Sequence, residues 1–414
     1  MSTKQIAIIG AGAAGFFAAI KCASDNPQCR VTLFEKSNKI LAKVRVSGGG
    51  RCNVTHACFD FKKLPAFYPR GQKEMIGSFS RFSVNNTIEW FESRGVSLKT
   101  EEDGRMFPVT DNSQTIIDCL LDEAEKLNVS IQRNRGVKHI KRMEDGSFEL
   151  IFQDETKCQC DKVIITTGGF PQLSGFDFIA ALGHTIVEPV PSLFTFNIPL
   201  SPLKGLEGIA VTNATVRLEG SKLSETGPLL ITHWGISGPA AIKLSAWAAR
   251  WLNEKNYECY LHINWLGDKK ENDLLNFFTS LRLEHPLKKI VANSFFGLPQ
   301  RLWERLVNLS GITEKENVAD LSKQKINKLI QLLCDTVLQC KGKTTYKEEF
   351  VTCGGVSLKE VNLQTMESIK VNGLYFAGEV LNIDGITGGF NFQSAWTTGW
   401  IAGLNAAAQN GDIK

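Results

Sequence analysis

The feature that most constrains this chain is a glycine-rich turn between a short strand and a helix near its N-terminus. Residues 5–9 form a mainly apolar run and residues 30–34 (Arg-Val-Thr-Leu-Phe) a second, and both predict buried parallel strands. Between them, Gly-Ala-Gly-Ala-Ala-Gly fits G-x-G-x-x-G, which permits a tight turn, close approach of a pyrophosphate and close packing of helix on strand. The turn therefore predicts a dinucleotide site formed by Gly10, Gly12, Ala13, Ala14 and Gly15.

An acidic residue ends the second of these strands. Glu35 lies twenty residues beyond Gly15, where a carboxylate accepts hydrogen bonds from a ribose diol and repels a 2′-phosphate. Lys36 follows it and is expected beside the same nucleotide. The helix that starts at the turn presents unpaired N–H groups and partial positive charge to the phosphates. These residues fit FAD and NAD equally well, so other parts of the chain must distinguish the two.

The C-terminal part of the chain carries a second set of glycines and acids. Gly378-Glu379 follows a predicted strand at 374–377, and a carboxylate at that end of a parallel strand points into the ligand crevice. There it would hold the ribityl hydroxyls of FAD, which NAD lacks. The glycine pair before the last helix would form an anion-binding nest for charge at flavin N1 and O2. The cofactor residues predicted here are Gly378, Glu379, Asp384, Gly385, Gly388, Gly389, Phe390 and Asn391.

The periodicity between these two ends predicts the remaining architecture. Helical segments are expected near 84–94 and 112–128, followed by a β-meander around Asp145-Gly146 that returns to the main sheet, with cofactor contacts at Val137, Thr167, Gly168 and Gly169. Strand-like alternation then gives way to helical spacing of apolar residues. We predict an α/β fold with a Rossmann-type FAD-binding domain at 1–189 and 354–414, a β-rich insert at 190–268 and 341–353, and a helical bundle at 269–340.

Composition excludes several classes of protein. The net charge of +4 over 414 residues gives little reason to expect a nucleic-acid or anionic-membrane partner. No apolar run approaches the roughly 18 residues that span a bilayer, and the first predicted strand leaves no room for a signal peptide. The 11 cysteines include no Cys-x-x-Cys pair, which argues against a disulfide reductase, and Cys158-x-Cys160 lacks two further ligands for a metal. Cytoplasm is the expected location.

Several motifs together resemble a known family. They are Ser-Gly-Gly-Gly-Arg-Cys-Asn at 47–53 after Lys43, Gly-Arg-Met-Phe-Pro at 104–108, Leu-Gly-His at 182–184, Thr-His-Trp-Gly-Ile-Ser-Gly-Pro at 232–239 and the two glycine-rich ends. This set is similar to the three-domain bacterial flavoproteins of the YhiN type, which include aminoacetone oxidase-like and BaiN-like members. The resemblance covers nearly the whole chain and implies an FAD domain, a β-barrel-like domain, a helical insert and an oxidoreductase role. One departure is Asn382, where the family usually has Asp.

The run at 47–53 is the strongest candidate for chemistry. Three consecutive glycines cost backbone entropy, which indicates close approach to a ligand. We expect Ser47, Gly48 and Gly49 to run along the isoalloxazine ring or the pyrophosphate of the cofactor, with Lys43 close to the same edge of it. Candidate catalytic residues are Arg51 for an anionic group, Cys52 as a redox thiol and His233 as an acid or base. The alternatives without a catalytic role are that Arg51 only donates hydrogen bonds to backbone carbonyls and that Cys52 and His233 have structural roles.

The sequence thus predicts an FAD-dependent oxidoreductase that acts on a small organic substrate through flavin N5. NAD(P)H as a transient co-substrate and oxygen both remain open as redox partners, since no second G-x-G-x-x-G is present. Two alternatives are an FAD-dependent RNA-modifying enzyme and a flavin-bound scaffold without turnover. Substrate identity and oligomeric state are not encoded in any motif.

Overall fold

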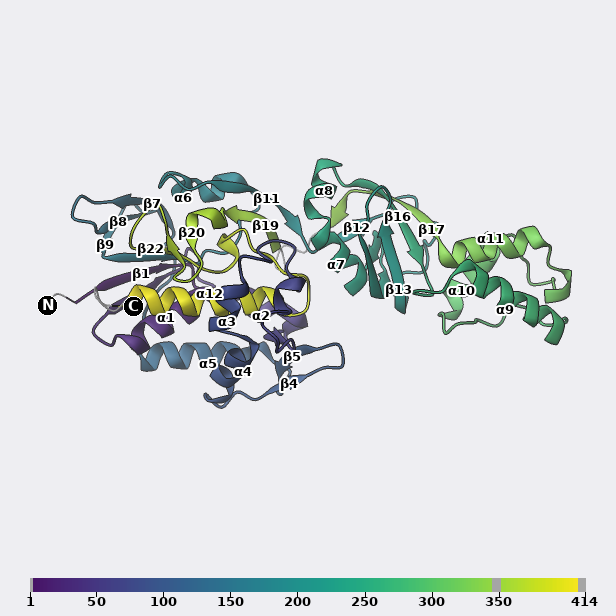
Figure 1. Cartoon of the computed structure of the whole chain (residues 1–414), viewed down its shortest axis with the longest axis horizontal. Coiled ribbons are helices and arrows are strands. Elements are labelled where there is room, and N and C mark those ends of the chain that lie inside the picture. The colour runs from purple at the N-terminus through teal and green to yellow at the C-terminus, as the bar shows by residue number, and fades with distance from the viewer. Residues whose placement is uncertain (1–2, 345–350, 409–414) are drawn as a thin grey trace. The chain divides into compact units, whose positions relative to one another are not determined.

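A computed structural model describes residues 3–344 and 351–408 of the chain. The chain divides into two compact units, Met1–Ser192 with Lys347–Lys414 as unit 1, and Leu193–Tyr346 as unit 2 (Figure 1). The finer division of the inserted part into a β-rich and a helical domain stays a prediction.

Unit 1 contains a seven-stranded sheet, counted over the described residues, in the order β20-β21-β22-β10-β1-β2-β6. At its centre, β1 (Gln5–Ile9) pairs in parallel with β2 (Arg30–Phe34) and with β10 (Lys162–Ile165). β22 (Leu374–Phe376) pairs in parallel with β10, so a C-terminal strand lies two positions from the first strand. The outer strands are β6 (Ser130–Gln132), β20 (Val361–Asn362) and β21 (Glu367–Ser368). The predicted α/β fold, with its sheet assembled from both ends of the chain, is confirmed.

Two glycine-preceded helices pack together beside this sheet. α1 (Ala13–Asp25) follows Gly12, and α12 (Phe390–Ala407) follows Gly389. Their backbones approach closely at Gly399, where an added Cβ would lie only 2.5 Å from the carbonyl oxygen of Ala14. Only glycine, which has no Cβ, permits this approach. Figure 1 shows α12 running alongside α1. The first and last helices are therefore packed against each other in one unit.

Smaller sheets and further helices complete unit 1. The predicted meander is present as β7 (Val137–Arg142), β8 (Phe148–Phe152) and β9 (Lys157–Cys160). Other strands are β3 (Thr55–His56), β4 (Leu98–Thr100) and β5 (Arg105–Pro108), and the pair β11 (Ile186–Ser192) and β19 (Val351–Val356). The α-helices are α2 (Ala42–Gly50), α3 (Ile76–Arg81), α4 (Val84–Glu92), α5 (Ser113–Lys126) and α6 (Asp177–Ala180). The 3₁₀ turns are η1 (Leu64–Phe67), η2 (Leu173–Phe176), η4 (Leu358–Glu360) and η5 (Gly378–Val380).

Unit 2 is an antiparallel sheet with helices that share one apolar core. Its strands, in sheet order, are β17 (Thr336–Lys341), β16 (Glu258–Asn264), β13 (Ala210–Leu218), β14 (Ser224–Ile231), β15 (Gly235–Ser237), β12 (Thr195–Asn197) and β18 (Lys343–Thr344). Its helices are α7 (Pro239–Trp247), α8 (Ala249–Glu254), α9 (Glu271–Glu284), α10 (Gln300–Leu309), η3 (Val318–Asp320) and α11 (Lys323–Cys334). The helical spacing ends at Cys334, earlier than residue 340, because β17 alternates buried and exposed side chains against β16.

Candidate functional site

The turn from β1 to α1 has the geometry that a pyrophosphate requires. Gly10 has a φ of 110°, and a Cβ there would lie 2.6 Å from the carbonyl oxygen of Thr166. A Cβ on Gly15 would lie 2.9 Å from Thr166 Oγ1, so this glycine packs helix against strand. At Gly12, by contrast, nothing lies within 4 Å of an added Cβ. The open side of Gly12 at the start of α1 is thus a cradle that a side chain would fill, and it fits a phosphate bound by helix N–H groups.

Glu35 is positioned by the loop that follows β2. Its Oε2 accepts a hydrogen bond from the Ala11 amide at 3.1 Å, and its Oε1 accepts from the amide and hydroxyl of Ser37, both at 3.0 Å. Since an ionised carboxylate offers about four lone-pair sites, capacity remains for a ribose hydroxyl. The half-buried carboxylate therefore fits the adenosine end of FAD. Its neighbour Lys36 is exposed, with its ammonium 5.4 Å from the ring centroid of Phe170.

The end of β10 joins the two halves of the site. Gly168 has a φ of 74° and open space where a Cβ would lie. Gly169 abuts Glu379, whose Oε1 would lie 2.8 Å from an added Cβ. The hydroxyl of Thr352, against the same glycine, is buried and finds no hydrogen-bond partner among the described residues. Of the predicted turn residues Thr167, Gly168 and Gly169, it is Gly169 that borders Glu379.

Glu379 forms an ion pair with Lys43, 336 residues earlier in the chain, with Nζ 2.6 Å from Oε2. Its other oxygen accepts a hydrogen bond from the Thr352 amide at 2.9 Å. A Cβ on Gly378 would lie 2.9 Å from the side chain of Ala14, in the first turn of α1. The two glycine-rich ends of the chain therefore lie together, as an extended cofactor requires.

The 47–53 run is a bend within and after α2. Ser47 leaves helical geometry with a ψ of 148°, and Gly48 and Gly49 have φ values of 59° and 69°. Open space lies above Gly49, whereas Gly48 packs against Phe107. Arg51 lies 2.6 Å from Glu101, 3.4 Å from Asp111 and 3.9 Å above the Phe107 ring. The hydrogen bond with Glu101 and the nearby Asp111 carboxylate raise the pKa of Arg51. Arg51 thus holds neighbouring strands together, and its catalytic role stays a prediction.

Cys52 is fully buried and has a φ of 62°. Burial raises the pKa of its thiol to about 12, which a hydrogen bond with Ser47 partly opposes. Because the thiolate is the reactive form, burial disfavours the reactive state of Cys52 near neutral pH. This environment agrees with the structural alternative for Cys52.

The glycine pair before α12 forms a tightly held turn. Gly388 and Gly389 have φ values of 127° and 98°. Asn391 closes the turn, since its side chain exchanges two hydrogen bonds of 2.9 Å with the backbone of Gly385. The Asn53 side-chain amide, oriented so that its nitrogen donates to the Thr55 carbonyl, accepts a hydrogen bond from the Gly389 amide; both distances are 3.0 Å. The side chains of Asn53 and Asn391 therefore fix the turn that starts α12.

Asp384 lies at the bottom of this turn with none of its surface exposed. Its carboxylate pairs with Arg70 through both oxygens and accepts a hydrogen bond from Ser192 Oγ at 2.9 Å. Burial raises the pKa of Asp384, and Arg70 opposes that shift. Sequence reasoning missed Arg70, because no local spacing links residues 314 positions apart. The neighbouring departure, Asn382, keeps its Oδ1 buried and unbonded within the described residues.

Three aromatic residues at the turn were also missed. His56 Nδ1 donates to Gly388 O at 3.0 Å, and its ring stacks on Phe390 with centroids 4.5 Å apart. Phe67 stacks on Phe390 at the same distance, and Tyr68 donates to the Phe390 carbonyl at 2.6 Å. The sequence offered little to predict these contacts. The one signal was that His56 lies three residues after the 47–53 run.

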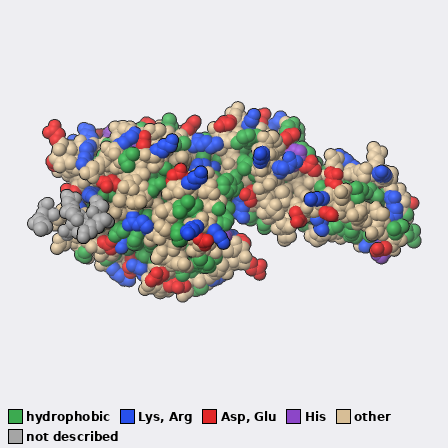
Figure 2. All heavy atoms as spheres, in the orientation of Figure 1, with side chains coloured by type: hydrophobic (Ala, Val, Ile, Leu, Met, Phe, Trp, Pro, Cys, Tyr) green, Lys and Arg blue, Asp and Glu red, His purple; other side chains and the backbone are tan. Residues whose placement is uncertain are grey.

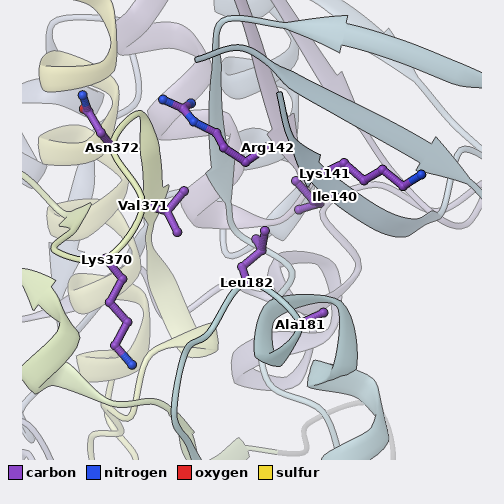
Figure 3. A pocket seen from close by; sticks show the side chains of 8 residues that line it. All are labelled: Ile140, Lys141, Arg142, Ala181, Leu182, Lys370, Val371 and Asn372. Carbon is purple, nitrogen blue, oxygen red and sulfur yellow. The ribbon is translucent and has the colours of Figure 1, made fainter. Parts of the chain in front are cut away.

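Two further predicted residues lie outside the turns described above, and their roles stay predictions. Val137 begins β7, on the meander. His233 lies in unit 2, between β14 and β15, with its ring 6.1 Å from that of Trp234. A separate hollow of about 560 Å³ opens in unit 1, and no predicted cofactor residue lines it; Figure 3 shows Lys141 and Lys370 pointing away from one another there. No cluster that could hold a metal ion occurs among the described residues.

Comparison with known proteins identifies the family of this chain. The family described as "HI0933-like protein Rossmann domain" matches residues 4–405. The chain belongs to this family. The HI0933-like protein is 33% identical over 412 residues to an Escherichia coli (strain K12) protein named ribosomal RNA dihydrouridine synthase, covering 97% of each chain. It is 28% identical over 412 residues to the 3-dehydro-bile acid delta(4,6)-reductase of Clostridium scindens, covering 98% and 99%.

The fold comparison agrees. A 3-ketosteroid-delta4-(5alpha)-dehydrogenase from Rhodococcus jostii RHA1 superposes with a TM-score of 0.53 at 14% identity, covering 99% of this chain and 98% of that one. At that identity only the fold is shared. This HI0933-like chain is thus a Rossmann-type flavoprotein of an oxidoreductase family, and its site fits FAD. Within the described residues, no helix is long and apolar enough to cross a membrane.

Proposed function

We propose that this HI0933-like flavoprotein reduces a carbon–carbon double bond, that of the uracil ring of a uridine in ribosomal RNA. The observation that carries the proposal is the charge of the segment that surrounds the cofactor loop. Residues 36–73 contain nine basic side chains and one acid, Asp60; the basic residues are Lys36, Lys39, Lys43, Arg45, Arg51, Lys62, Lys63, Arg70 and Lys73. The names of the curated relatives supply the reaction class.

Part of this charge is neutralised inside the fold. Lys43, Arg51 and Arg70 pair with carboxylates from other elements. The other six basic side chains of the segment are exposed, and none has a carboxylate within 4.0 Å in the described part of the chain. On the face that Figure 2 shows, Lys and Arg side chains are interspersed with Asp and Glu. A local excess of exposed cations beside the site supports an anionic polymer as substrate, although the whole chain is close to neutral.

The chain's own residues would bind FAD along its whole length. Gly12 and the start of α1 would hold the pyrophosphate, Glu35 the adenosine ribose and Glu379, oriented by Lys43, the ribityl hydroxyls. The start of α12, after Gly389, would present helix N–H groups to the ring. When bound, FAD supplies two-electron transfer at N5. NAD(P)H would supply the electrons by binding transiently.

The test uses the purified flavin-loaded protein with ribosomal RNA that carries no dihydrouridine. With NADH or NADPH present, mass spectrometry of digested nucleosides is expected to detect dihydrouridine, and the Gly12→Val variant, which should lack FAD, serves as the control. If the flavin is reduced by the nicotinamide nucleotide but the RNA gains no dihydrouridine, the RNA substrate is wrong.

A second candidate is reduction of a small conjugated ketone, favoured by the similarity to the bile acid reductase. The same flavin-loaded protein is incubated with a steroid dienone and NAD(P)H, and the ultraviolet absorbance of the conjugated system is followed. Loss of that absorbance without dihydrouridine formation in RNA would select this candidate.

A further inference from the structure

The residues that flank the loop at 57–66 both contact the turn that precedes α12. At its start, His56 donates to Gly388 O at 3.0 Å and stacks on Phe390. At its end, the carbonyl of Phe67 accepts a hydrogen bond from the Ile386 amide at 3.0 Å, and the Phe67 ring lies 4.5 Å from that of Phe390 at an interplanar angle of 14°. The loop therefore leaves and rejoins the fold at the turn assigned to the flavin ring.

The outer part of this loop is ordered by its own hydrogen bonds. Asp60 Oδ1 accepts from the Lys62 amide at 2.9 Å, and the Asp60 carbonyl accepts from the amides of Lys63 and Leu64 at 2.9 and 3.0 Å. Leu64 and Pro65 are buried below. The hydrogen bonds of Asp60, the one acidic residue of the loop, hold the backbone of this turn in place. The other side chains of the loop therefore project from an ordered backbone.

The side chains that this backbone presents are aromatic and cationic. Phe59 is 52% exposed, although a large aromatic side chain gains most by burial. Lys62 and Lys63, three and four residues further along the same loop, are also exposed, and Lys62 Nζ lies 5.9 Å from the ring centroid of Phe61. Lysine is depleted at protein–protein interfaces, whereas an exposed ring next to cations is the combination that binds single-stranded nucleic acid.

We propose that loop 57–66 is an RNA-binding arm, in which Phe59 stacks on an unpaired base and Lys62 and Lys63 contact the flanking phosphates. This inference rests on the proposed function, because it assumes that the substrate is ribosomal RNA. A uridine must leave its stack to reach a reactive centre, and this costs least where the uridine lies in a single-stranded stretch, whose neighbouring bases are also unpaired. The arm holds that neighbouring stretch beside the turn at Gly388.

The experiment measures binding of a short fluorescent uridine-rich single-stranded RNA by anisotropy over a range of KCl concentrations. Lys62→Ala/Lys63→Ala is expected to lower the slope of log Kd against log salt by about 1.4, at about 0.7 for each lost phosphate contact on a single strand. Phe59→Ala is expected to weaken binding about 5- to 150-fold without changing that slope, which corresponds to loss of one base stack. Both variants should keep wild-type FAD content and dithionite reduction.

Matched controls remove the same groups elsewhere. Lys323→Ala/Lys328→Ala deletes two exposed lysines of α11, and Leu173→Ala deletes an apolar side chain that is also 52% exposed. Neither should change affinity or slope. If wild-type protein forms dihydrouridine in ribosomal RNA while the arm variants keep wild-type affinity and slope, the arm is refuted and the function stands. If wild-type protein forms no dihydrouridine in ribosomal RNA, the proposed function itself has failed.

Discussion

Replacement of Arg70 by leucine tests whether the turn before α12 depends on a buried ion pair. Asp384 has none of its surface exposed, and its charged partner is Arg70, with Ser192 as a neutral donor. Removal of one partner from a buried pair costs about 3–5 kcal/mol, since the remaining charge is left in a poorly solvated site. The Arg70→Leu variant should therefore lose about two to three and a half orders of magnitude in the folding equilibrium of unit 1.

The loss should also depend on pH. Burial already raises the pKa of Asp384, and Arg70 opposes the shift, so its removal raises that pKa further. Between the unfolded and the raised folded pKa the folded state binds more protons, so stability falls as pH rises through this window. The cost of Arg70→Leu should thus be smaller at mildly acidic pH than at neutral pH.

Hydrogen exchange of peptides from β1 and β10 measures the opening free energy of unit 1 itself. The control is Arg70→Leu/Asp384→Asn, in which no charge remains to be buried; it should recover much of the stability and lose the pH dependence. A single variant as stable as wild type, or one whose loss is the same at both pH values, would refute the argument.

Three further predictions concern other residues. Gly12→Val should fold normally but lose FAD, whereas Gly15→Val should unfold unit 1, since only the second Cβ meets backbone; FAD content and circular dichroism distinguish them. Cys52→Ala should keep FAD and most flavin reduction, and iodoacetamide at pH 8 should leave Cys52 unmodified, because burial holds the pKa of its thiol at about 12. Cys259 and Cys340 lie directly opposite on β16 and β17, so diamide should oxidise the two thiols to a disulfide, visible as a linked peptide of two hydrogens lower mass; separate unlinked peptides would contradict that.

Local sequence patterns were sufficient for the parts of the fold whose signal is short-range. The buried strand at 5–9, the glycine turn and the strand at 30–34 are confirmed as one βαβ unit because each depends on neighbouring residues. The pairing of Glu379 with the N-terminal half could also be anticipated, since the cofactor needs contacts at both ends. Local sequence patterns, together with the contacts that FAD requires, were thus enough to predict the Rossmann-type FAD-binding fold.

Tertiary structure alone decided which side chains are already engaged. Arg51 seemed available for an anion until Glu101 was found beside it, and the partner of Asp384 proved to be Arg70, a residue with no motif around it. The exposure of Phe59, on which the proposed arm rests, was equally hidden, because local sequence does not show whether a phenylalanine is buried. Sequence determines which groups exist and their local backbone preferences; contacts between distant residues are set by how the sheet and helices pack, and that packing decided the rest.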